Sequence, residues 1–478
     1  MSLFESPEYR QDQAFGGTKY AGLKLLQRLG VNTLDNIFSP GFEVYDQLMA
    51  GELGQWMQQA YVQRDVIMQA YEQHLQGEKC DTNTVHKAFQ FFNVRSFSAK
   101  QLGESFTDKA RLYVTRQESL VQRISEFIQS DESYLYRSSA DIEDEEANTA
   151  GLFHTVINPF PNERKEEEIV DNLALFFGHN LAISLFQRRP ARLNVVICGA
   201  INSEAGGIGL SYMPSGDYYF EIAENPIAIC QDGKTFMTII QGTHSHFTVS
   251  KVNKNNQLKH LVQGVPSYAS EAQIRVGLST LEKIEAAVGS PLHIELLWKK
   301  DSIEPTVLQV RKYISQVADQ QISDDNFTAA DFATVVGIKP GAVTVPVFNV
   351  PYVTYLKDEL QMIDESATLN ALRTLNRENP KGYALLDEDR LTMNSMSVPL
   401  GDFYVEEPTI DFLRRMCTNV KVFISNYEFS SRGGHGRLNM ASDNSNQFYL
   451  SIPGFKVSDG AIAQIRSDGY RGIVNLLK

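Results

Sequence analysis

A candidate phosphate-binding segment, FGGTKYAGLKLLQRLG, begins at Phe15. Glycine lets the backbone approach a ligand closely, and the N-terminus of a helix favours an anion. Lys19, just before an amphipathic stretch, would add a positive point charge. The segment predicts a contact to phosphate, whereas two adjacent glycines before a helix more often form only a turn.

A second candidate, YLYRSSADIEDEEANTAGLF, begins at Tyr134. It places Arg137 at the end of an expected strand, followed by Ser138 and Ser139. A guanidinium binds oxyanions through two parallel hydrogen bonds, so an arginine beside hydroxyl groups suits a polyphosphate. The acidic run at 143–146 that follows has the composition of a solvated loop.

A third candidate, SPLHIELLWKKDSIEPTVLQVR, begins at Ser290 and has the pattern of two strands joined by a polar turn. Such a hairpin would bring Glu295 close to Gln309, and Arg311 would face the same way as Gln309 because side chains alternate with a period of two. A carboxylate and a carboxamide side by side can hold Mg²⁺ against phosphate oxygens. The segment predicts a metal and nucleotide site, and the alternative is a surface hairpin with ordinary polar side chains.

His435 lies in the glycine-rich segment SRGGHG, which begins at Ser431. A neutral imidazole is a good nucleophile, and the flanking glycines leave room for a phosphoryl group. A helix that begins after His435 would stabilise the added negative charge. We interpret His435 as a candidate phosphocarrier, and the alternative is a loop histidine with no chemical role.

These segments need a scaffold of helices and sheets. Over 45–130 the apolar residues recur at helical spacing, which predicts several amphipathic helices. Over 134–310 short β-rich runs alternate with Gly and Asn-Pro turns, which predicts an α+β fold with a sheet at its centre. The polar stretch 316–334 predicts a hinge, and the strands and helices after it predict a small α/β domain.

Composition restricts the class of protein. A chain of 478 residues exceeds what one hydrophobic core usually supports, so more than one domain is expected. The net charge of −14 opposes binding to nucleic acid or to anionic lipid. The four cysteines stand far apart, and no run of about 18 apolar residues occurs. We therefore expect a cytoplasmic protein with no nucleic-acid partner and no membrane association.

The order and spacing of these segments resemble the pyruvate phosphate dikinase and phosphoenolpyruvate synthase family. Family members carry Gly-Gly-Lys-Gly-Ala-Asn-Leu near the start, where this chain has GTKYAGL at 17–23, and then a Pro-Gly-Phe segment, here at 40–42. Their Arg-Ser-Ser, Glu-Asp and Ala-Gly elements recur between Arg137 and Gly151. Their Asp-Ile-Glu and Leu-Gln-x-Arg pair resembles HIE at 293–295 and LQVR at 308–311.

This resemblance implies an ATP-grasp module with a helical N-terminal lobe, which uses ATP and Mg²⁺. Lys19, Arg137 and Arg311 would bind the ATP phosphates, and the two arginines would also be catalytic. Glu295 and Gln309 would hold the magnesium ion.

The segment GGIGLSYMPSGD, from Gly206, resembles the family's glycine-containing loop that covers the phosphates. The backbone amides of Gly206 and Gly207 would then cap the triphosphate. The resemblance also places Glu221 among the residues that bind the nucleotide.

The C-terminal part resembles the family's swivelling phosphohistidine domain. His435 lies where the family has its transfer histidine, the stretch from Glu407 to Met416 matches a preceding region, and the final segment at 468–474 matches the closing hairpin. The expected domains are therefore an ATP-grasp domain over 1–315, a hinge over 316–334 and a phosphohistidine-like domain over 335–478.

Several positions depart from the family pattern. His293 replaces the family aspartate, and Ser430-Ser431 replaces a glycine pair before the histidine. Glu221 is one of the acidic residues that could compensate for the lost aspartate. No pyruvate-binding barrel is expected after His435, because a barrel needs on the order of 200 residues or more.

The sequence predicts an ATP-dependent phosphotransferase that cleaves ATP to AMP. A phosphoryl group would pass through His435 to an unidentified acceptor, either a small molecule or a partner protein. One alternative is a nucleotide-binding pseudoenzyme that regulates a partner protein. Another is direct ATP-grasp ligation, which would need an acyl acceptor site and no transfer histidine.

Overall fold

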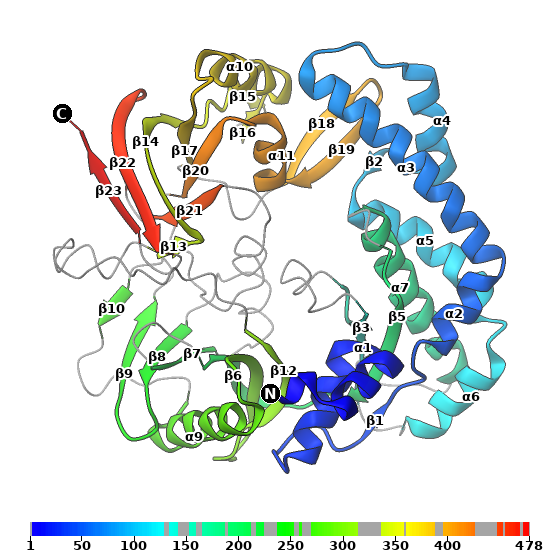
Figure 1. Cartoon of the computed structure of the whole chain (residues 1–478). Helices are drawn as coiled ribbons and strands as arrows, with labels where there is room; N and C mark the ends of the chain where they lie inside the picture. The colour runs from blue at the N-terminus through cyan, green and yellow to red at the C-terminus, as the bar shows by residue number, and fades with distance from the viewer. Residues whose placement is uncertain are drawn as a thin grey trace. The chain divides into compact units, whose positions relative to one another are not determined.

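The computed structural model divides into two compact units, which are described separately (Figure 1). The first contains the described residues up to Val62 and from Ala99 to Tyr313, and the second contains 63–98 and the described residues from 336 onwards. The structure describes residues 2–128, 133–141, 153–158, 165–186, 190–211, 217–223, 237–252, 258–260, 269–313, 336–357, 360–387, 395–425, 447–452, 455–468 and 472–477.

The helices predicted over 45–130 are confirmed. Two glycines allow the close packing of α5 against α7: a Cβ on Gly103 would lie 2.6 Å from the His179 ring, and a Cβ on Gly178 would lie 2.5 Å from the Thr107 backbone. The helices in this part of the chain are α2 (Glu43–Ala50), α3 (Glu52–Gln76), α4 (Thr82–Phe92), α5 (Ala99–Val114) and α6 (Glu118–Phe127), and α7 (Lys165–Phe186) follows later in the chain.

Among the described residues, α7 is the one helix that is long and apolar enough to cross a membrane. However, 61% of its apolar window is buried inside the protein. This burial is that of a core helix, and α7 packs on α5 and α6.

Helix α1 (Pro7–Arg28), which follows the short helix η1 (Leu3–Glu5), is broken at Gly17. Gly17 has a φ of 82°, which favours glycine, and divides α1 into two helical segments. A helix follows the glycines, as predicted, but it begins directly after Gly17 and so includes Lys19, and helix also precedes the glycines. The Tyr20 amide donates to the Ser139 hydroxyl at 3.1 Å, so a side chain from a distant strand caps the second segment.

Two antiparallel sheets complete the first unit, and the β-rich runs predicted over 134–310 are confirmed, among them β5, β7 and β8. A four-stranded sheet has the order β1-β5-β3-β4 and a seven-stranded sheet the order β10-β9-β8-β7-β6-β11-β12. The first sheet contains β1 (Ile37–Phe38), β3 (Tyr134–Ala140), β4 (Val156–Asn158) and β5 (Leu193–Gly199). The second contains β6 (Ser203–Leu210), β7 (Tyr218–Ala223), β8 (Met237–Gly242), β9 (Phe247–Val252), β10 (Leu258–His260), β11 (Leu292–Lys299) and β12 (Thr306–Lys312).

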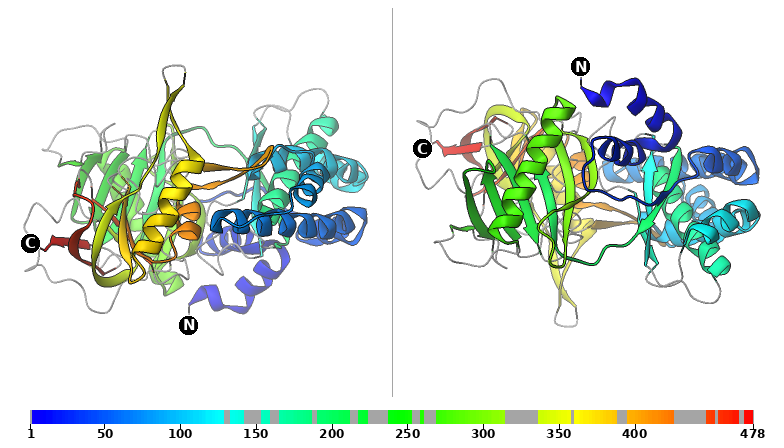
Figure 2. Two further views of the ribbon diagram at one scale, coloured as in Figure 1. Left: turned by 90° about the horizontal axis from the view of Figure 1, so that it is seen from above. Right: turned by 90° about the horizontal axis from the view of Figure 1, so that it is seen from below.

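One face of the seven-stranded sheet is hydrophobic and lies against α9 (Glu271–Val288) (Figure 2). The buried cluster there combines residues of the sheet with residues of α9 and α1. The sheet supplies Phe220, Ile222, Ile240, Ile294, Leu296 and Val310, while the helices supply Ile274, Leu278, Leu281, Ile284, Ala21, Leu25 and Leu26.

The second segment of α1 packs against both sheets. Leu23 lies in a buried cluster with Val196 of the four-stranded sheet, whereas Leu26 belongs to the core of the seven-stranded sheet. Gly22 makes the approach to β12 possible, because a Cβ there would lie 2.7 Å from the carbonyl oxygen of Val310. Lys19 is thereby held close to both sheets.

The second unit has a seven-stranded mixed sheet of order β13-β21-β20-β17-β14-β22-β23. Its central strands β14, β17, β20 and β21 are parallel, as expected for a small α/β domain. The predicted closing hairpin is confirmed, because β22 pairs with β23. The sheet strands are β13 (Val336–Ile338), β14 (Pro340–Asn349), β17 (Tyr383–Asp387), β20 (Val420–Ser425), β21 (Phe448–Ser451), β22 (Ala461–Asp468) and β23 (Gly472–Leu476). The other elements are β15 (Thr354–Lys357), β16 (Leu360–Ile363), α10 (Glu365–Glu378), β18 (Ser395–Leu400), β19 (Phe403–Pro408) and α11 (Thr409–Met416).

The second unit also includes residues 63–98, which the sequence assigned to the first domain. Strand β2 (Ser96–Phe97) pairs with β19, and the Phe89 ring stacks on Phe403 with centroids 4.5 Å apart. Tyr71 donates to the buried Glu407 carboxylate at 2.5 Å. Burial raises the pKa of this carboxyl, and Arg415, which donates to it at 3.0 Å, opposes that shift.

Candidate functional site

The face of the seven-stranded sheet opposite the hydrophobic core carries a row of polar residues. Register places Glu221 on β7 opposite Ile208 on β6, Ile208 opposite Glu295 on β11, and Glu295 opposite Gln309 on β12. Residues directly opposite one another in antiparallel strands share a face. The predicted hairpin and the predicted proximity of Glu295 to Gln309 are therefore confirmed.

A second row lies two residues further along the same face. Arg311 on β12 is opposite His293 on β11, followed by Leu210 and Tyr219 on the next strands. The Arg311 Nε donates to His293 Nδ1 at 3.1 Å, and its Nη2 donates to Glu295 Oε1 at 3.4 Å. Tyr219 donates to the Glu221 carboxylate at 2.8 Å. Arg311 and Gln309 share a face, as predicted.

Arg137 reaches this polar face from the four-stranded sheet. It lies in the middle of β3, so its predicted position at a strand end is wrong, because the pairing with β5 continues to Ala140. Its Nη2 donates to Gln309 Oε1 at 3.2 Å and lies 3.6 Å from Glu295 Oε2. Its Nη1 donates to the Leu308 carbonyl at 2.9 Å.

The carbonyl that receives Arg137 is available because β12 contains a bulge. Glu295 pairs with Gln309 and Leu296 with Val307, so Leu308 has no partner on β11. A bulge leaves an extra residue unpaired and re-aims the groups beside it, and bulges are frequent next to active sites. Here the bulged residue supplies a backbone acceptor for Arg137.

Lys19, from the first candidate phosphate-binding segment, contacts strand β3. Its Nζ donates to the Ser138 hydroxyl at 3.3 Å, and its side chain is half-buried. Ser138 follows Arg137 directly on β3, so α1 contacts this strand next to the arginine. The structure thus brings together Arg137, Glu295, Gln309 and Arg311, which the sequence had taken from two separate segments, and places Lys19 at the neighbouring residue of β3.

The charges of the central contacts do not cancel. Two guanidinium groups, those of Arg137 and Arg311, contact one carboxylate, that of Glu295. Both arginines are buried, and a buried charge without full compensation is costly. Glu221 is two strands from Glu295, roughly 10 Å at the usual strand spacing. The arrangement therefore favours an anionic ligand that would share the charge of the two arginines.

The donor types of Glu295 and Gln309 suit Mg²⁺, which prefers oxygen ligands and is commonly held by one or two carboxylates together with substrate phosphates. Among the described residues, no group of three or more His, Cys, Asp or Glu side chains could hold a metal ion alone. The oxygens of both residues also accept contacts from the arginines. These residues fit a metal ion that arrives with a polyphosphate.

The prediction that Gly206 and Gly207 form a phosphate-covering loop is wrong. Both lie inside β6, between β7 and β11, where Gly207 is opposite Ile222 and Leu296. Gly207 serves strand packing, because a Cβ there would lie 1.7 Å from the Glu221 carbonyl oxygen. The end of the predicted loop, at 212–216, lies outside the described residues.

Other predicted features also lie outside the described residues. These are His435, the acidic run at 143–146 and the hinge at 316–334.

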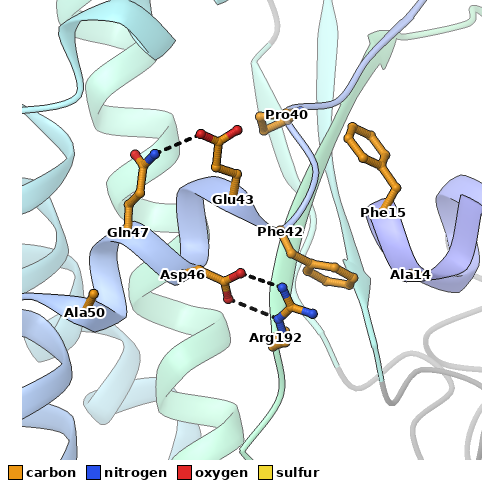
Figure 3. Close-up of a pocket in the computed structure, with 9 residues that line it drawn as sticks. All are labelled: Ala14, Phe15, Pro40, Phe42, Glu43, Asp46, Gln47, Ala50 and Arg192. Atoms are coloured by element: carbon orange, nitrogen blue, oxygen red, sulfur yellow. Dashed lines mark hydrogen bonds and ion pairs between the residues drawn. The ribbon is translucent and has the colours of Figure 1, made fainter. Parts of the chain in front are cut away.

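A pocket of about 570 Å³ lies elsewhere in the first unit, and Figure 3 shows the side chains around it. Arg192 lies over the Phe42 ring at 4.6 Å and pairs with Asp46, while Gln47 donates to Glu43 at 3.0 Å. Its one arginine is paired with Asp46 and Glu43 adds a second carboxylate, so this pocket lacks the excess of positive charge found in the arginine cluster. The residues around it are Ala14, Phe15, Pro40, Phe42, Glu43, Asp46, Gln47, Ala50 and Arg192.

Three contributors to the site were not predicted: the acceptor role of His293, the carbonyl of Leu308 and the helix cap from Ser139. The two-residue period could have placed His293 beside Glu295, because both lie on one strand at alternate positions. Nothing in the local sequence marks Leu308 as a bulge or Ser139 as a partner of α1, since both depend on contacts between distant segments.

Comparisons with known proteins add no family to this description, because no protein-family model and no curated protein matches the chain.

Proposed function

We propose that the protein is an ATP-dependent phosphotransferase of the ATP-grasp type. The observation that carries the proposal is the convergence of Arg137, Glu295, Gln309 and Arg311 on one polar sheet face. Phosphoryl transfer depends mainly on positioning and on neutralising charge, and guanidinium groups with a metal ion supply both. The excess of positive charge in this cluster supports a polyphosphate as the ligand.

The chain's own residues would divide the work as follows. Arg137 and Arg311 would bind phosphate oxygens and stabilise the charge that develops during transfer, and Lys19 would add a further cation. Glu295 and Gln309 would hold Mg²⁺, which supplies Lewis-acid stabilisation of the phosphates when bound. Glu221, further along the same face, would bind the nucleotide.

The second unit would act as the phosphocarrier. Its mixed sheet with four parallel central strands is that expected for a small α/β domain, and His435 belongs to the same part of the sequence. AMP would be released as the βγ-pyrophosphoryl group passes to His435, and water would remove the γ-phosphate as inorganic phosphate. The remaining phosphoryl group would pass from His435 to an unidentified small molecule or partner protein. We place this activity in the cytoplasm, without a nucleic-acid or membrane partner.

A specific observation also supports a second candidate, a nucleotide-binding pseudoenzyme that regulates a partner. His293 contacts Arg311 at the position of the family aspartate, so one acidic metal ligand of an active enzyme is replaced. Phosphorus-31 NMR of the protein with ATP and Mg²⁺ distinguishes the candidates. Formation of AMP, limited to about one turnover without an acceptor, supports the enzyme, and intact bound ATP supports the pseudoenzyme.

Lys19→Gln should weaken the binding of MgATP about tenfold, because it removes one charge-assisted phosphate contact. Calorimetry at fixed ionic strength measures the effect. Lys24→Gln is the matched control, since Lys24 lies further along α1, where its Nζ contacts Gln27 and the Tyr20 ring. Equal losses in both variants, or no loss in Lys19→Gln, would remove Lys19 from the site.

A further inference from the structure

His293 forms a buried hydrogen bond with Arg311, and the proposed nucleotide site does not by itself explain this contact. Its side chain is 1% exposed, and its backbone pairs directly with that of Arg311. Nδ1 lies 3.1 Å from the Nε of Arg311, in a buried hydrogen bond. A buried polar contact of this kind normally has both partners satisfied.

The chemistry of the pair fixes the state of the imidazole. A guanidinium has five N–H donors and no acceptor, so Nδ1 of His293 must accept. The ring therefore carries its proton on Nε2 and is neutral, because an imidazolium has two donors and no acceptor.

We propose that His293 is a positioning residue that aims Arg311 at an anionic ligand while leaving the charge of Arg311 intact. This inference rests on the proposed function for the identity of the ligand, a nucleoside triphosphate. His293 holds Nε and Glu295 holds Nη2, so the plane of the guanidinium is fixed by contacts on two of its nitrogens. Two N–H groups on Nη1 then remain for phosphate oxygens, because the Arg311 side chain makes no other hydrogen bond within the described part of the chain.

A neutral acceptor at this position differs from a carboxylate in its effect on charge. With His293, the two guanidinium groups of Arg137 and Arg311 face one carboxylate, and one positive charge remains. An aspartate would give two positive and two negative groups, leaving no excess for the phosphates. With histidine at position 293, Arg311 keeps a positive charge that can attract phosphate. With aspartate, that charge would be offset, and the phosphates would depend more on a metal ion held by the acidic residues.

The tautomer tests the positioning role without reference to ATP. In nitrogen-15 spectra of the protein labelled at its nine histidines, the signals lost in His293→Asn identify His293. The proposal expects its Nδ1 to resonate as an unprotonated nitrogen and its Nε2 as a protonated one. A proton on Nδ1, or an imidazolium in the native protein, would overturn the proposal, even if ATP binds.

Two substitutions test the consequence for the ligand. His293→Asn keeps a neutral acceptor near the position of Nδ1 and should bind MgATP within about threefold of the wild type, whereas His293→Leu keeps the volume but lacks an acceptor and should bind roughly tenfold or more weakly. The melting temperature of each variant shows whether it is folded. Wild-type affinity in a folded His293→Leu protein would contradict the positioning role. If the wild type does not bind ATP at all, the proposed function fails, and the tautomer still decides whether His293 orients Arg311.

Discussion

Glu295→Gln is expected to weaken the affinity for MgATP by about 100-fold and to strengthen the affinity for ATP without metal. The amide keeps the size of the side chain and an oxygen acceptor for Arg137 and Arg311, which lie 3.6 and 3.4 Å from the carboxylate. It removes the negative charge that holds Mg²⁺, and a 100-fold loss corresponds to about 2.7 kcal/mol. Without metal, the triphosphate meets two arginines whose charge is no longer offset, so attraction rises.

Calorimetric titration with ATP, with and without Mg²⁺, measures both effects. Glu304→Gln is the matched control, because it removes the same charge from an exposed position in the turn between β11 and β12. A distant effect of net charge would appear in both variants. If the Glu295→Gln substitution changed the affinity for ATP by the same factor with and without Mg²⁺, the role of Glu295 as a metal ligand would be contradicted.

The polar sheet face could be predicted from the sequence because it depends on local alternation. The turn-linked pattern from Ser290 predicted a hairpin, and the two-residue period predicted that Gln309 and Arg311 share a face. The pairing of Glu295 with Gln309 confirms this inference. The sequence could not predict the bulge at Leu308, because its position depends on how β12 pairs with β11 and packs on α1.

Two predictions were wrong because the outcome depends on contacts between segments that are distant in the sequence. Glycines at 206 and 207 have the composition of a phosphate loop, yet Gly207 is needed because the Glu221 carbonyl occupies the space of a Cβ. The assignment of 63–98 to the first domain followed chain order, whereas β2 pairs with β19, more than three hundred positions later in the numbering. Such long-range pairing leaves no signal in local periodicity.

His435→Ala is expected to abolish phosphorylation of the protein while leaving ATP binding intact. If the imidazole attacks the β-phosphorus and AMP leaves, the βγ-pyrophosphoryl group is transferred to His435. Hydrolysis then releases the γ-phosphate as inorganic phosphate and leaves the β-phosphoryl group on the histidine, so ATP labelled at the β-phosphate should label the protein. A phosphoramidate is stable to base and lost in acid, which distinguishes it from a phosphoester on serine or threonine. Labelling after a base treatment and after an acid treatment measures the outcome.

His246→Ala is the control for the loss of a histidine, because His246 is exposed in the turn between β8 and β9. It should be labelled as strongly as the wild type. Persistent acid-labile label in the His435→Ala protein would assign the carrier to another residue. Absence of label in the wild type, together with tight MgATP binding, would favour the pseudoenzyme.

The most direct test of the central claim is a crystal structure with a non-hydrolysable ATP analogue and Mn²⁺ in place of Mg²⁺. Phosphate oxygens are expected within hydrogen-bond distance of Arg137 and Arg311. An anomalous Mn²⁺ signal is expected between the phosphates and the oxygens of Glu295 and Gln309. A nucleotide bound elsewhere, for example in the pocket beside Phe42 and Arg192, or a metal signal remote from Glu295, would contradict that claim.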